Sequence, residues 1–177
     1  MLKTIYLVKQ LRVLCGEFEE LDIQAFSNED LASEFLNKEL NTWSEYAKEH
    51  TNMSIFEDGF SSVIYNIYGT IEDNLFFDLD VAQVDIKDDM SDEIYVYNEI
   101  NICKSGEIST HTLPFINKEV SVKELNSEVN NRSNPNSNNY YKVSDKWNDE
   151  DFTRLELKDE EGNISFLENF AIKLNNN

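Results

Sequence analysis

The chain has 177 residues, of which 40% are hydrophobic and 12% aromatic, and fifteen basic residues against 35 acidic ones give a formal net charge of -20. This composition provides ample material for a packed core and excludes global disorder. It also disfavours direct binding to nucleic acid or to anionic membranes, because a strongly negative surface repels phosphate groups. The natural complement is a basic protein surface, such as the cleft of an enzyme that handles nucleic acid.

Neither the cysteines nor the first residues indicate secretion. Cys15 and Cys103 are the only cysteines, and they form no CxxC pair, which favours a reducing compartment. Residues 1–9 contain only a short apolar stretch without a small-residue cleavage site, and no run approaches the ~18 apolar residues of a membrane span. We therefore predict a cytoplasmic protein without a membrane span.

The first fifty residues predict two strands and a long helix. Apolar residues alternate with polar ones in 3–14 and 18–26, which predicts an opening hairpin. Apolar residues then recur at helical spacing over 28–49, behind Ser27 as an expected cap with Asp30 three residues later. A ββα opening is therefore expected.

Four strands and a short helix are predicted next. The strands occupy residues 63–68, 75–81, 94–103 and 108–115. A turn is expected at Glu72-Asp73-Asn74 between the first two strands. Ser121 with Glu124 three residues later is a capping signature for a helix that ends near Asn130. The sequence thus predicts a meander of antiparallel strands followed by a short helix.

The predicted fold class is α+β, with an antiparallel sheet of several hairpins, one long N-terminal helix after the ββα start and a second short helix. The Asn-rich segment 130–139 has no apolar residue and predicts a flexible loop. It divides a main α+β domain, 1–129, from a C-terminal hairpin, 140–177, that is too small to be stable alone and is expected to pack on the main domain. The sequence contains no recognisable internal repeat of fixed period.

Acidic residues concentrate between residues 55 and 102, where twelve carboxylates accompany a single base, Lys87. Duplex DNA carries one charge per ~1.7 Å of its axis, so carboxylates spaced a few ångströms apart on strands and loops can imitate a phosphate path. Two tyrosines border the segment and could anchor an interface. The predicted partner-binding residues are Asp78, Asp80, Asp85, Asp88, Asp89, Asp92, Glu93, Tyr95 and Tyr97.

The same carboxylates could instead serve solubility or metal binding. A charge-rich surface also keeps a protein in solution without any partner. Residues 85–96 have no Gly at the sixth position and no Glu at the twelfth, which excludes an EF-hand loop, while a two-metal site with Lys87 nearby is a weaker alternative. The sequence has no zinc-binding spacing, phosphate-binding loop or nucleophile elbow. We therefore predict a protein that is not an enzyme and has no cofactor.

The composition and the acidic segment together favour an acidic inhibitor that binds a basic protein and not nucleic acid or a membrane. In this hypothesis the chain occupies the nucleic-acid cleft of a nuclease or defence enzyme, as phage anti-CRISPR and DNA-mimic proteins do. One alternative is an immunity protein that neutralises a basic bacterial toxin. A further alternative is a metal-dependent enzyme that uses the acidic loop.

Overall fold

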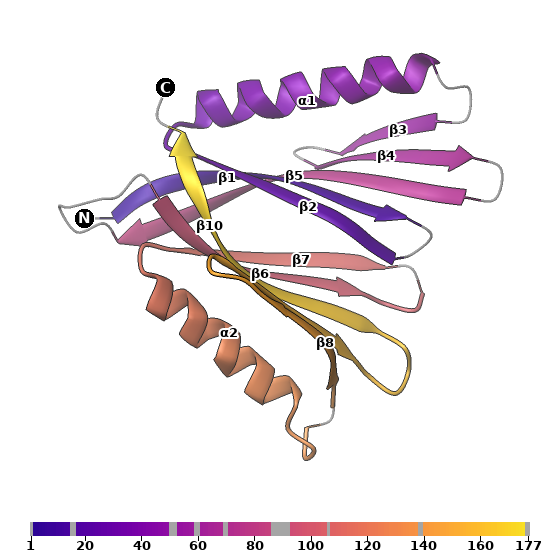
Figure 1. Cartoon of the computed structure of the whole chain (residues 1–177). Coiled ribbons are helices and arrows are strands. Elements are labelled where there is room, and N and C mark those ends of the chain that lie inside the picture. Colours follow the sequence, from indigo (N-terminus) through magenta and orange to yellow (C-terminus); the bar gives the residue numbers. More distant parts are fainter. Residues whose placement is uncertain are drawn as a thin grey trace. The chain divides into compact units, whose positions relative to one another are not determined.

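The computed structural model describes residues 2–14, 17–49, 53–58, 61–68, 71–85, 93–105, 107–137 and 140–175 (Figure 1). These residues form ten strands and two helices, which confirms the predicted α+β class. The chain divides into two compact units. We call Leu2–Gln83 with Leu174–Asn177 the N-terminal unit, and Val84–Lys173 the C-terminal unit. No helix of the described residues is long and apolar enough to cross a membrane.

The N-terminal unit is a sheet in the strand order β3-β4-β5-β1-β2 with one helix. Its elements are β1 (Leu2–Leu14), β2 (Glu17–Phe26), α1 (Glu29–Glu49), β3 (Met53–Asp58), β4 (Ser61–Tyr68) and β5 (Ile71–Asp85). Strands β1 and β2 pair antiparallel, as do β3 with β4 and β4 with β5. The end of β10 (Ile164–Asn175) completes the unit, because Leu174 and Asn175 pair in parallel with Ala25 and Phe26 of β2.

Helix α1 covers this sheet with the apolar face that the sequence pattern predicted. Its residues Ala32 and Leu36 are buried in a cluster with Val8, Phe26 and Phe77 of the strands. Burying a Leu- or Phe-sized side chain contributes roughly 2 kcal/mol, so this contact holds the helix on the sheet.

The cap of α1 is Asn28 and not the predicted Ser27. The Asn28 side chain accepts a hydrogen bond from the backbone N–H of Asp30 at 2.7 Å, and its carbonyl accepts the N–H of Ala32. The N–H and hydroxyl of Ser27 are instead donated to the carbonyl of Asn175 in β10. Ser27 therefore stabilises the pairing of the last residues of β10 with β2 inside the N-terminal unit.

The C-terminal unit has the strand order β8-β9-β10-β6-β7 and one helix (Figure 1). Its elements are β6 (Glu93–Ile102), β7 (Ile108–Phe115), α2 (Lys118–Arg132), β8 (Lys142–Asn148), β9 (Phe152–Lys158) and most of β10. All four neighbouring strand pairs are antiparallel.

Helix α2 begins three residues before the predicted cap. Asn117 is the capping residue, since its side chain accepts the N–H groups of Glu119 and Val120. Ser121 lies one turn inside the helix, is fully buried and accepts a hydrogen bond from Asn169 of β10. Leu125, one turn further on, packs on β6, β9 and β10 in a cluster with Tyr97, Leu155, Leu157 and Leu167.

The two units share one architecture that the sequence does not reveal. Each runs β-β-α-β-β-β along the chain, and each orders its strands with the third, fourth and fifth followed by the first and second. In the first hairpins Tyr6 pairs with Phe26, and 89 positions later Tyr95 pairs with Phe115. The expectation of no internal repeat is therefore wrong for the structure, in which equivalent positions share a fold and some of them, such as Tyr6 and Tyr95, also share their residue type.

Burial repeats at the same spacing of 89 residues. The order of buried and partly buried positions along Ile5–Arg12 is the same, position by position, along Ile94–Asn101. In the helices the buried residue one turn after the capping asparagine is Ala32 in one unit and Ser121 in the other, and Leu36 corresponds to Leu125. These equivalent positions of the two units therefore have the same burial even where their residue types differ.

Strand boundaries differ from the sequence prediction in the middle of each unit. Strands β3 and β8 were not predicted. The expected turn at Glu72-Asp73-Asn74 lies inside β5, where Asp73 pairs with Asn66 of β4. The division into units also differs from 1–129, 130–139 and 140–177, because β10 returns to pair with β6 along Ile164–Lys173. In the sequence, β7, α2, β8 and β9 separate β6 from β10.

Candidate acidic interface

The predicted acidic residues fall into three groups. Asp88, Asp89 and Asp92 lie outside the described residues. Asp78 and Asp85 lie in β5. The remaining acids, Asp80 and Glu93, have described side chains and belong to different units.

Asp80 neutralises a buried lysine in the N-terminal unit. The Nζ atom of Lys9 lies 2.6 Å from Oδ2 of Asp80, and the side chain of Lys9 is only 3% exposed while that of Asp80 is 39% exposed. A buried ammonium group needs a charged partner, so the Asp80 carboxylate is committed to the fold. Asn98, which occupies the position of Lys9 in the C-terminal unit, is likewise buried and donates to the carboxylate of Glu168 at 3.2 Å. Both units therefore place an acid beside a buried polar residue of their first strand.

Glu93 and Tyr95 lie together at the start of β6. The hydroxyl of Tyr95 donates a hydrogen bond to Oε2 of Glu93 at 2.9 Å. This bond, followed by burial and by the charges of Glu93 and Asp151, raises the pKa of Tyr95, so the phenol remains a donor at neutral pH. Glu93 is exposed and Tyr95 is partly exposed, so both are accessible to a partner.

Tyr97 has a different environment from Tyr95. It is buried beneath α2, and its hydroxyl donates to Glu99 at 3.2 Å. Burial, followed by the neighbouring charges of Glu99 and Glu128, strongly raises its pKa. Tyr97 is a residue of the core, where its ring has no access to a docked protein.

Sequence reasoning overlooked three acidic residues at the same end of the C-terminal unit as Glu93 and Tyr95. Asp149, Glu150 and Asp151 form the exposed turn between β8 and β9, in which the Asp149 N–H donates to the carbonyl of Phe152 at 2.7 Å. Phe152 pairs with Phe170 of β10, which in turn pairs with Val96 of β6, so this turn lies at the same end of the sheet as Glu93 and Tyr95. We call Glu93, Tyr95, Asp149, Glu150 and Asp151 the acidic end of the C-terminal unit.

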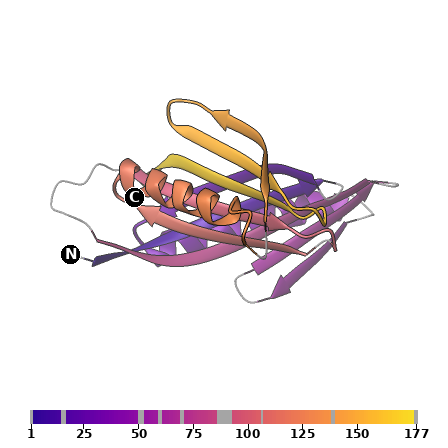
Figure 2. The ribbon, with the colours of Figure 1, turned by 90° about the horizontal axis from the view of Figure 1, so that it is seen from below.

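Lys118, in the first turn of α2, holds the β8–β9 turn in place. Its Nζ donates to the carbonyl of Glu150 at 2.7 Å and lies 3.2 Å from Oδ1 of Asp151. Figure 2 shows the β8–β9 hairpin, in orange, at the margin of this unit. The sequence signal for the turn was the run Asn148-Asp149-Glu150-Asp151, which lies outside the interval 55–102 in which the charge is densest.

The acidic end presents its carboxylates to solvent. Among residues 2–14, 17–49, 53–58, 61–68, 71–85, 93–105, 107–137 and 140–175, no three His, Cys, Asp or Glu side chains converge as metal ligands. The carboxylates of Asp149, Glu150 and Asp151 instead project from an exposed turn. Four carboxylates outnumber the two lysines beside them, Lys118 at the turn and Lys173 opposite Glu93, and leave a net negative surface that can attract a basic partner.

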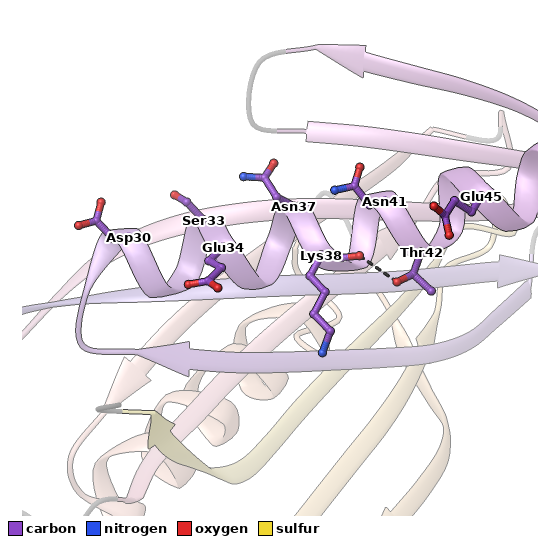
Figure 3. A pocket seen from close by; sticks show the side chains of 8 residues that line it. All are labelled: Asp30, Ser33, Glu34, Asn37, Lys38, Asn41, Thr42 and Glu45. Carbon is purple, nitrogen blue, oxygen red and sulfur yellow. Dashed lines mark hydrogen bonds between the residues drawn. The ribbon is translucent and has the colours of Figure 1, made fainter.

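A shallow hollow on α1 is a second acidic surface, in the N-terminal unit. Figure 3 shows that every side chain lining it comes from this one helix. Asp30, Glu34 and Glu45 carry its negative charge against Lys38, and the hydroxyl of Thr42 is donated to the Lys38 carbonyl at 2.9 Å. A hollow without a second wall cannot enclose a ligand, so this is a solvated helix face.

A partly buried ionic network lies at the other end of the C-terminal unit, at the last turn of α2. The guanidinium group of Arg132 donates to Glu99, to Oε1 of Glu128 at 2.6 Å, to Asn101 at 2.9 Å and to Ser165 at 2.8 Å. Burial opposes ionisation of Glu99, but hydrogen bonding by Asn101 and the charge of Arg132 outweigh it and lower its pKa. The pocket beside Arg132 is lined in part by Asn101 and Glu128, which already accept hydrogen bonds from its guanidinium group.

In the N-terminal unit an aromatic residue takes the position of Arg132. Trp43 stands 89 positions before Arg132 and packs in the cluster of Val8, Phe26 and Phe77. One architecture thus accepts either an aromatic side chain or a charged network at the end of its helix. An arginine at this position is consequently not a requirement of the fold.

No protein-family model, curated protein or solved structure matches the chain.

Proposed function

We propose that the chain binds a basic protein, occupies the cleft in which that protein binds nucleic acid, and uses the acidic end of the C-terminal unit for this contact. The observation that carries the proposal is that the Asp149–Asp151 turn lies at the same end of the sheet as Glu93 and Tyr95. These residues are exposed or partly exposed, and their four carboxylates outnumber the two neighbouring lysines, Lys118 and Lys173.

Electrostatics gives this contact its expected kinetics. A net charge of -20 steers a basic partner towards the chain over a distance of about one Debye length, which is ~10 Å at 0.1 M salt. Carboxylates at the rim of an interface mainly raise the association rate and add less to the final affinity. Binding should therefore weaken steeply as salt is added.

A competition assay tests the proposal. A guide-free CRISPR nuclease and a basic restriction endonuclease, each with labelled duplex DNA, are mixed with increasing amounts of the chain. We expect release of the DNA from at least one enzyme at low salt and little release at high salt. Retention of the DNA by both enzymes at low salt would count against the proposal.

Charge-matched variants locate the contact. The variant Asp149→Asn, Glu150→Gln, Asp151→Asn removes three charges from the acidic end. The control Glu107→Gln, Glu160→Gln, Glu161→Gln removes three charges from exposed turns of the same unit. Competition should be lost in the first variant and kept in the control. Equal losses in the two variants would show that only total charge matters.

A further inference from the structure

Strand β8 presents an exposed tryptophan next to the acidic end. All seven residues of β8 are exposed, and Trp147 retains 43% of its surface in contact with solvent. Trp147 lies two residues before Asp149, and Val120, which is 49% exposed, lies two residues after Lys118. A large apolar side chain therefore stands exposed on the strand that leads into the acidic turn.

The surroundings of Trp147 have the composition of a binding hot spot. Trp147 pairs across the hairpin with Arg154 of β9, whose guanidinium lies 5.3 Å from the centre of the Phe152 ring. Phe152 in turn lies 6.2 Å from Phe170 of β10. Tryptophan and arginine are enriched where interfaces draw most of their energy, and an exposed indole loses apolar contact with water when a partner covers it.

The side chains of β8, and not its backbone, are the docking element. Strand β8 lies at the margin of the strand order and pairs with β9. Its register shifts between Val143 and Asp145, and Lys142 and Lys146 lie along it. A bulge and edge lysines are features that prevent another strand from adding to a sheet. A partner is therefore expected to cover Trp147 by side-chain contact.

We propose that Trp147 is the apolar anchor of a docking surface, and that its occupant is a protein face on which an apolar pocket is surrounded by lysines and arginines. This inference rests on the proposed function and adds the source of the affinity. Charge complementarity supports this occupant. The lysines and arginines around a pocket that receives Trp147 would lie against Asp149, Glu150 and Asp151. The carboxylates set the association rate, whereas the indole sets the dissociation rate.

Two synthetic peptides of equal length and equal positive charge test this division of roles. One combines lysine with serine, and the other combines lysine with leucine. We expect both peptides to bind at low salt, with the leucine peptide binding tighter and dissociating more slowly. Equal affinity of the two peptides for the parent chain would overturn the inference. Failure of both peptides to bind at low salt would instead refute the proposed function.

Substitutions at β8 supply the matched comparison. Trp147→Ala should weaken binding of the leucine peptide by about tenfold or more and leave the serine peptide unchanged. Val143→Ala removes a side chain of similar exposure from the same strand and should change neither affinity. A Trp147→Ala chain that still prefers the leucine peptide as strongly as the parent would contradict the role of Trp147.

A measurement on the unaltered indole does not depend on the folding of the Trp147 variant. The chain has two tryptophans, so Trp43→Phe leaves Trp147 as the sole indole. The leucine peptide should shift its fluorescence to the blue and protect it from acrylamide, whereas the serine peptide should do neither. Unchanged quenching by acrylamide in the presence of saturating leucine peptide would place the contact elsewhere.

Discussion

The ammonium group of Lys118 lies 3.2 Å from the carboxylate of Asp151 and thereby joins the first turn of α2 to the turn between β8 and β9. Both side chains are largely exposed, so the ion pair contributes little to stability. Its effect on the potential of the surface is greater, because Lys118 is the base in contact with the acidic turn. The pair therefore offers a way to change charge without disturbing the fold.

Lys118→Gln is expected to make the acidic end more attractive to a basic partner. The free energy of unfolding should change by about 1 kcal/mol or less, as is usual for an exposed ion pair. The association rate of the lysine and serine peptide, measured by stopped-flow fluorescence at low salt, should rise. A matched substitution at another exposed lysine, Lys142→Gln, removes the same charge from β8 and should have a smaller effect on the rate. Equal rises would contradict a local role of Lys118.

The capping asparagines of the two units should be equally important. Asn28→Ala and Asn117→Ala each remove a side chain that accepts N–H groups of the first helical turn. Each substitution should cost about 1 kcal/mol in the free energy of unfolding. Hydrogen exchange should show the loss in α1 for the first variant and in α2 for the second.

Aspartate substitutions provide the control for the capping prediction. Asn28→Asp and Asn117→Asp retain an acceptor oxygen at the cap and should preserve stability. Loss of protection in both helices from a single alanine substitution would contradict the assignment of one cap to each unit.

The ionic network at the end of α2 should show strong coupling between Arg132 and Glu99. Arg132→Met leaves the Glu99 carboxylate, which is only 13% exposed, without its cation. This change should lower the free energy of unfolding by roughly 3 kcal/mol, since breaking a buried pair is more costly than replacing both partners. The double variant Arg132→Met, Glu99→Gln should lose less than the sum of the single variants. Additive losses in denaturant titrations would contradict direct coupling.

The lowered pKa of Glu99 predicts how this network responds to acid. Because the folded chain lowers the pKa of Glu99 below its ordinary value of 4.5, the unfolded chain binds the proton more tightly. The stabilisation is therefore fully present well above pH 4.5 and is lost as the pH falls through the pKa of the folded state.

Glu99→Gln removes this dependence. The difference in the free energy of unfolding between parent and variant should be constant near neutral pH and should shrink below pH 4.5. Urea titrations across this range measure it, and Glu160→Gln, at an exposed turn, serves as the control. A parent-to-variant difference that is the same at every pH would exclude ionised Glu99 as the stabilising form.

Local sequence patterns predicted the elements whose two faces differ. The apolar spacing in 28–49 gave α1, observed as Glu29–Glu49, and the alternation before and after residues 104–107 gave the hairpin of β6 and β7. Strand β8 was missed because all seven of its residues are exposed, so it has no alternation between buried and exposed positions. The pairing of β10 with β6 was missed because no local pattern encodes contacts between residues so far apart in sequence.

The candidate interface was predicted only in part, for a related reason. Charge counted along the chain pointed to Glu93 and Tyr95, which the structure describes together. The same count omitted Asp149–Asp151, because the fold and not the sequence brings that turn to the same end of the sheet as Tyr95. Tyr95 and Tyr97 have the same residue type and nearly the same place in the sequence, yet packing beneath α2 removes Tyr97 from the surface.

The hydrogen bond from Ser27 to Asn175 has a consequence for synthesis on the ribosome. These residues are 148 positions apart, and the Asn175 side chain also donates to the carbonyl of Ala25. In the nascent chain the end of β2 therefore pairs with β1 on one edge, while its other edge stays without a partner from β10 until β10 has been translated. An exposed strand end is a site for premature association with other chains. Translation speed through the C-terminal unit thus sets how long this end stays vulnerable.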